Sequence, residues 1–197
     1  PVPRQGFFTL AGDTFALPLL GSQVDAVTGA TPLGLMKFEG VRTATSDLFL
    51  GTIAGSAGET SALLILLGGA WLAYKNYLNW RIPVSILVVV AVLSSAMNAI
   101  DPTSFPGAPF MLFSGGLMLG AVYMATDMVT SPVTNRGAWV YGAGIGALVV
   151  LIRLWGGLPE GVMYAILLMN ALVPFIDKAT QPRVFGTGRR VAKGVPQ

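Results

Sequence analysis

The chain has 197 residues, of which 53% are hydrophobic and only 11% charged, with a formal net charge of +3 at pH 7. Ordinary soluble domains carry roughly 25% charged residues, so this composition excludes a soluble globular protein and predicts one that uses the bilayer as solvent. Cysteine and histidine are both absent, which excludes disulfides, iron–sulfur clusters and histidine-based catalysis, and we predict no metal site.

Residues 1–59 are expected to form a segment outside the membrane. Glycines interrupt the stretch throughout, together with Pro18 and Pro32, so it lacks a continuous apolar run and is too long for a simple connector. Long loops of this kind often carry functional residues. The chain begins with Pro1 instead of methionine and shows no signal peptide, so we expect that a longer parent sequence has lost an N-terminal part.

One stretch of this segment presents a hydroxyl group. Thr31 precedes a proline, which favours an extended backbone at Thr31, and Gly29 and Ala30 add almost no bulk beside it. Asp25 and Thr28 supply a carboxylate and a second hydroxyl within a few residues. A large group could therefore attach at Thr31, although the residues alone also describe an ordinary turn.

Five apolar stretches follow, each a candidate for a membrane-spanning helix, which needs roughly 17–25 residues. We predict an all-α integral membrane protein in which residues 60–177 form a bundle of about five transmembrane helices, followed by a basic tail at 178–197. The predicted spans are Thr60–Tyr77, Ile82–Ile100, a segment of Pro102–Thr126 that starts near Pro109, Gly137–Trp155 and Gly161–Ile176.

The last two spans have uncharged cores of only 16 residues, so each is alternatively one arm of a re-entrant pair. Arg153, Trp155 and Tyr164 flank these cores and suit anchoring at the membrane interface.

Small residues recur at the spacing that lets membrane helices approach closely. Gly116–Gly120 and Gly142–Gly146 both match this pattern. We expect close packing among the helices of the chain itself, with contact to another subunit or a planar cofactor as the alternative.

Basic residues are concentrated on one predicted side of the membrane. The tail, the Lys75–Arg81 turn and the Asp127–Arg136 loop lie on the same side and hold eight of the twelve Lys and Arg residues. The positive-inside rule therefore predicts a cytoplasmic tail and places Thr31 on the outer face, which in a Gram-negative cell is the periplasmic face of the inner membrane. The excess of basic residues is then explained by the orientation of the chain in the membrane, so it requires no nucleic-acid partner.

The stretch Asp25–Thr31, which reads Asp-x-x-Thr-Gly-Ala-Thr, resembles the flavinylation motif of the sodium-pumping NADH:quinone reductase and Rnf complexes. Three further stretches, Gly55–Ser61, Ala125–Pro132 and Asn170–Asp177, resemble the D subunit of the Rnf complex. The likeness covers essentially the whole chain but only the second half of that family's subunit. Ala26 replaces a glycine common in the motif.

The resemblance implies that Thr31 carries FMN through a phosphoester bond, attached on the outer face by an FMN transferase that takes FMN from FAD. Asp25, Thr28, Gly29 and Ala30 would belong to the same cofactor-binding site. The implied function is that of a membrane subunit of an ion-translocating ferredoxin:NAD oxidoreductase that relays electrons and couples them to Na⁺ or H⁺ movement. Its implied partners are the other Rnf subunits and membrane lipid.

Three further residues are candidates for contacts with a flavin. Glu59 and Thr60 lie at the start of the first span, where Glu59 suits a flavin contact or an ion path. The simpler interpretation is that Ser56 or Thr60 caps this helix. Asp127 ends the third span, and the resemblance connects its region with a second, non-covalent riboflavin; a solvated helix end is the alternative.

Two other functions remain as alternatives. The B subunit of the sodium-pumping NADH:quinone reductase would share the fold and the flavin but pass electrons to quinone. A non-redox permease half, in which the Thr-Gly-Ala-Thr stretch is a plain loop, belongs to a different class.

Overall fold

The computed structural model describes residues 32–39, 44–50, 61–102, 105–158 and 160–182. Within these ranges the chain is mostly helical and contains no strand, which agrees with the predicted all-α class. The elements are α2 (Pro32–Glu39), α3 (Thr45–Leu50), α4 (Ala62–Tyr74), α5 (Arg81–Ile100), α6 (Ala108–Phe113), α7 (Leu117–Leu119), the π-helical turn η1 (Gly120–Met124), α8 (Asn135–Trp155) and α9 (Val162–Thr180).

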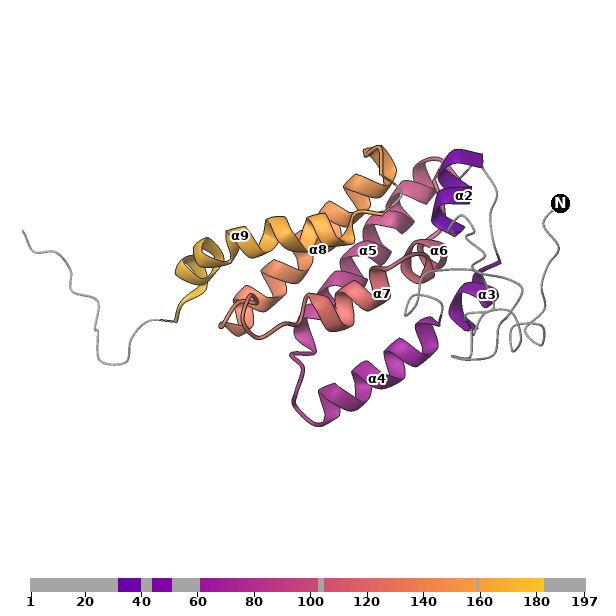
Figure 1. The fold of residues 1–197 in the computed structure, drawn as a ribbon. Helices are drawn as coiled ribbons and strands as arrows, with labels where there is room; N and C mark the ends of the chain where they lie inside the picture. The colour runs from indigo at the N-terminus through magenta and orange to yellow at the C-terminus, as the bar shows by residue number, and fades with distance from the viewer. Residues whose placement is uncertain (1–31, 40–43, 51–60, 103–104, 159, 183–197) are drawn as a thin grey trace, which may run out of the picture.

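Three long helices form the body of the molecule. α8 packs against both α5 and α9 (Figure 1), and the side chains of Ile86, Tyr141 and Ile145 are fully buried in the core they share. α5, α8 and α9 have 20, 21 and 19 residues and are apolar enough to cross a membrane. At 1.5 Å per residue each is about 30 Å long, which matches the hydrocarbon thickness of a bilayer. The predicted second, fourth and fifth spans are therefore continuous helices.

The first predicted span is shorter than expected among the described residues. α4 has 13 residues, fewer than a perpendicular crossing of the bilayer needs. Its N-cap is Ser61, whose hydroxyl accepts a hydrogen bond from the Leu64 N–H at 3.4 Å. Neither Ser56 nor Thr60, the caps expected from the sequence, is the N-cap of this helix.

The third predicted span is broken. α6 ends at Phe113, and the chain passes through Ser114, Gly115 and Gly116 before α7 and η1 resume. Gly115 has a φ of +67°, a conformation that side-chain-bearing residues rarely adopt. The single helix expected within Pro102–Thr126 is therefore divided at its two consecutive glycines.

Arg153 of α8 binds this break. Its guanidinium donates hydrogen bonds to the carbonyl oxygens of Met111 at 2.6 Å and Ser114 at 2.9 Å. Carbonyls at the end of a helix lack helical partners, so the guanidinium replaces the donors that a continuous helix would supply. Arg153 is only 4% exposed, so it does not anchor at the membrane interface as expected, whereas Trp155 and Tyr164 are exposed.

The small residues bring the helices of the chain together, as expected. A Cβ on Gly142 would lie 2.8 Å from the Ile82 carbonyl oxygen, and one on Gly146 would lie 3.0 Å from that of Ile86. Gly120 has equally little space beside Val162 of α9. Gly120, Gly142 and Gly146 therefore contribute to packing within the chain.

The bundle has two distinct ends. At the α2 end lie α2, α3, the break and the turn between α8 and α9; at the Asp127 end lie the Asn76–Arg81 turn, the 125–134 loop and the end of α9 (Figure 1). The Val133 N–H donates to the Asp177 carboxylate at 3.2 Å, and the Thr134 and Thr180 hydroxyls bond at 2.5 Å. These bonds hold the 125–134 loop against the end of α9, and the Asp177 carboxylate accepts a backbone N–H there.

We predict that Arg153→Met destabilises the protein by leaving two carbonyl oxygens unsatisfied, at about 1–3 kcal/mol each. The apparent melting temperature in detergent should fall clearly below that of the unaltered chain. Arg136→Met is the matched control, because Arg136 lies in the same helix but is exposed. Equal melting temperatures for the two variants would contradict the role given to Arg153.

Candidate functional site

Most of the predicted site residues lie outside the described ranges. These are Asp25, Thr28, Gly29, Ala30, Thr31, Glu59 and Thr60. Asp127 is described. The described part of the chain nearest to the Asp25–Thr31 motif is the helix that begins directly after it.

α2 begins at Pro32, directly after Thr31. Proline suits the first position of a helix, where its missing N–H has no helical partner to lose and its φ is already helical. Pro32 is buried, and Leu33, which is 2% exposed, packs with Leu48 of α3 and Phe110 of α6. The residue after Thr31 is thus fixed on the α2 end of the bundle.

Lys37 ties α2 to the end of α8. Its Nζ donates to the carbonyl oxygens of Arg153 at 3.0 Å, Gly156 at 2.5 Å and Leu158 at 2.8 Å. A cation is favourable here because the last carbonyls of a helix carry partial negative charge. Burial lowers the pKa of Lys37 from its ordinary value of 10.5, while the three carbonyl oxygens favour its charged form.

The contacts of Lys37 and Arg153 form one polar cluster at the α2 end. The Arg153 carbonyl accepts from Lys37, and the Arg153 side chain donates to the break. The Glu160 carboxylate lies beside the break, since a Cβ on Gly115 would be 2.8 Å from Glu160 Oε1 and 3.3 Å from Arg153 Nη2. Glycine at position 115 therefore leaves space for both charged groups.

The sequence interpretation missed Lys37, Arg153 and Glu160 as members of a shared site. Arg153 had a signal, because an arginine within an apolar span is costly and usually has partners. The Ser114–Gly116 stretch was a second signal, for a break in the span. Lys37 had no local signal, since the carbonyl of Arg153 that it contacts lies 116 positions further along the chain.

Asp127 lies at the other end of the bundle. It is exposed, and its carboxylate accepts a hydrogen bond from the Thr130 hydroxyl at 3.2 Å. Its carbonyl accepts from the Ser131 N–H at 3.1 Å. In geometry Asp127 resembles a solvated turn.

A polar pocket of about 510 Å³ lies next to this turn. It is lined by Asn76, Tyr77, Leu78, Asn79, Trp80, Arg81, Thr126, Met128, Ser131, Pro132 and Val133. Amides, hydroxyls, aromatic rings and one guanidinium thus surround a space at a membrane-helix end. Among all described residues, no three His, Cys, Asp or Glu side chains meet in a way that could hold a metal ion.

Curated relatives share extensive similarity with this chain, and the three named here are all D subunits. This chain is 50% identical over 182 residues to the D subunit of the proton-translocating ferredoxin:NAD⁺ oxidoreductase complex of Clostridium ljungdahlii. The match covers 87% of this chain and 55% of that protein. This chain is 46% identical over 187 residues to the D subunit of the ion-translocating oxidoreductase complex of Stutzerimonas stutzeri. The match covers 89% of this chain and 52% of that protein. This chain is 44% identical over 166 residues to the D subunit of the Na⁺-translocating ferredoxin:NAD⁺ oxidoreductase complex of Acetobacterium woodii. The match covers 82% of this chain and 50% of that protein.

The chain spans about half the length of the curated relatives it matches. The model of the NQR2, RnfD, RnfE family matches residues 6–186, which include the Asp25–Thr31 motif, both ends of the bundle and all described helices. This protein therefore belongs to the NQR2, RnfD, RnfE family.

Proposed function

We propose that this chain works as part of the D subunit of an Rnf-type ion-translocating ferredoxin:NAD oxidoreductase and relays electrons through FMN bound covalently to Thr31. The observation that carries the proposal is the family match across residues 6–186. The relatives named above are all D subunits, which favours this function over that of the quinone-reducing B subunit and over an unrelated permease.

The residues of the chain would hold the carrier in place. The Thr31 hydroxyl provides the oxygen of the phosphoester bond, while Gly29 and Ala30 leave space for the attached group. The buried Pro32 and Leu33, together with the Lys37 anchor, support a rigid mounting because they fix the helix that begins one residue later. The flavin supplies the redox chemistry, and the protein supplies position and environment.

The other predicted contacts form part of the same proposal. Asp25 and Thr28 offer a carboxylate and a hydroxyl to the covalent flavin. Glu59 and Thr60 precede the N-cap of α4, where they would contact a flavin or an ion. A non-covalent riboflavin near Asp127 would lie at the opposite end of the bundle.

The proposed topology has five crossing segments in the bacterial inner membrane, with Thr31 on the periplasmic face and the tail in the cytoplasm. The bonds between Lys37 and the end of α8 support this orientation. They bring α2 to one end of the bundle, whereas Lys75, Arg81 and Arg136 adjoin the other. Excess positive charge is typical of the cytoplasmic side. The coupling ion would be Na⁺ or H⁺.

We predict that Thr31→Ala abolishes covalent flavin because it removes the oxygen that the phosphate needs. The chain would be expressed with the FMN transferase and tested by ultraviolet fluorescence of the denatured band and by intact mass. Thr14→Ala, in the same segment but outside the motif, should retain the signal. A Thr31→Ala protein that still carries flavin would disprove the attachment site.

We also predict that Lys37→Met loosens α2 without preventing flavin attachment. Loss of hydrogen bonds from a charged group costs about 1.5–3 kcal/mol, so backbone amides of α2 should exchange with deuterium about tenfold faster or more. Lys178→Met is the control, because Lys178 is an exposed lysine at the Asp127 end. Unchanged exchange in α2 would rule out the anchoring role of Lys37.

A further inference from the structure

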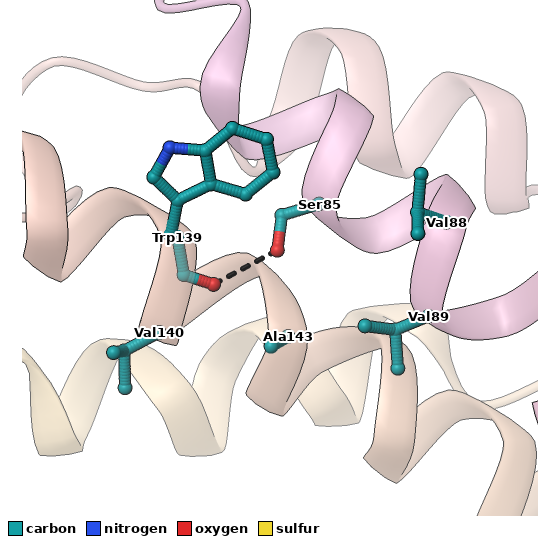
Figure 2. A pocket seen from close by; sticks show the side chains of 6 residues that line it. All are labelled: Ser85, Val88, Val89, Trp139, Val140 and Ala143. Atoms are coloured by element: carbon teal, nitrogen blue, oxygen red, sulfur yellow. Dashed lines mark hydrogen bonds between the residues drawn. The ribbon is translucent and has the colours of Figure 1, made fainter. Parts of the chain in front are cut away.

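An open apolar groove lies between α5 and α8 close to the Asp127 end. It has a volume of about 330 Å³ and is lined by Ser85, Val88, Val89, Trp139, Val140 and Ala143 (Figure 2). Ser85 supplies the one side-chain hydroxyl in this lining, and it already donates to the Trp139 carbonyl oxygen at 2.8 Å. The groove therefore offers a surface for hydrocarbon and no free hydroxyl.

The floor and the walls of the groove differ in side-chain size. Ser85 and Ala143 are small, whereas the valines at 88 and 140 stand beside them and are each 52% exposed. This apolar lining suits the hydrocarbon of an acyl chain. An acyl chain placed against these valines would gain van der Waals contacts with them.

The polar pocket defined above provides the complementary chemistry. Asn76, Asn79 and Arg81 bring N–H donors to it, and Thr126 and Ser131 bring hydroxyls. None of the side chains that line it is a carboxylate. Its donors therefore suit an anionic, oxygen-rich group such as a phosphate.

Two tryptophans join the pocket to the groove. Trp80 lines the pocket, Trp139 lines the groove, and their rings meet edge to face with centroids 6.2 Å apart. The Arg81 guanidinium lies over the Trp80 ring at 5.2 Å from its centroid. Tryptophan prefers the boundary between hydrocarbon and headgroups, so the pair marks the point where a polar head would pass into an apolar tail.

The charge at this end favours an anion. The described basic side chains here are Lys75, Arg81, Arg136 and Lys178, and the acidic ones are Asp127 and Asp177. Basic pockets between membrane helices are suited to anionic lipid headgroups. The excess of basic groups therefore complements a phosphate in the pocket.

We propose that the polar pocket and the α5–α8 groove together bind one anionic phospholipid, with its phosphate beside Arg81 and one acyl chain in the groove. The pocket is lined by Thr126 and Met128, the chain neighbours of Asp127, so a riboflavin found in this pocket in place of a lipid would overturn the proposal. The charge of Arg81 favours an anionic over a zwitterionic lipid, and the N–H and hydroxyl donors of the pocket favour a polar headgroup over an apolar protein helix.

The first experiment uses the purified full complex, stripped of lipid in detergent and titrated with phosphatidylglycerol or phosphatidylcholine while bound lipid is counted by native mass spectrometry. We expect phosphatidylglycerol to bind more tightly, and Arg81→Gln to weaken it by about tenfold, the ratio that corresponds to roughly 1.4 kcal/mol. Arg136→Gln, at the same end but outside the pocket, should bind as the unaltered protein does. Equal affinity for the two lipids, or an unchanged affinity in Arg81→Gln, would overturn the proposal.

A second experiment identifies what lies in the groove. A photoreactive amino acid replaces Val140, an exposed residue of the groove wall, and the complex is irradiated in native membranes. A phospholipid adduct on this chain supports the proposal. An adduct with another protein segment or with a quinone would show a different occupant and overturn it.

Discussion

The Arg153 guanidinium donates to two carbonyl oxygens at the break between α6 and α7, and its own carbonyl accepts a hydrogen bond from Lys37. In an apolar environment every backbone polar group needs a partner. Arg153 therefore makes the break tolerable and, through Lys37, connects it to α2. The helix that follows Thr31 is thus tied to the interior of the bundle.

The two ends of the bundle have different chemistry. At the α2 end, the side chains of Lys37 and Arg153 donate hydrogen bonds to backbone carbonyls. At the Asp127 end, tryptophans, amides and basic side chains surround an open pocket. Three helices of about 30 Å separate these ends. A covalent carrier at Thr31 and a lipid at Arg81 would therefore act at opposite faces of the same scaffold.

Several features could be predicted from the sequence because they depend on local composition. Long apolar stretches predicted α5, α8 and α9 close to their observed bounds, and Gly142–Gly146 predicted close helix packing. The break at Gly115 could also have been predicted, because Ser-Gly-Gly interrupts an apolar run. It was missed because hydropathy averaged over a span does not respond to backbone conformation.

The sequence by itself determined that this chain belongs in a membrane, which stretches form its long helices, and that a proline directly follows the Asp25–Thr31 motif. These conclusions follow from hydrophobicity and from neighbouring residues. Only the tertiary structure decided that Lys37 caps α8, that Arg153 is buried at a break, and that Trp80 meets Trp139. Each of those contacts joins residues far apart along the chain, so it exists only once the helices have packed.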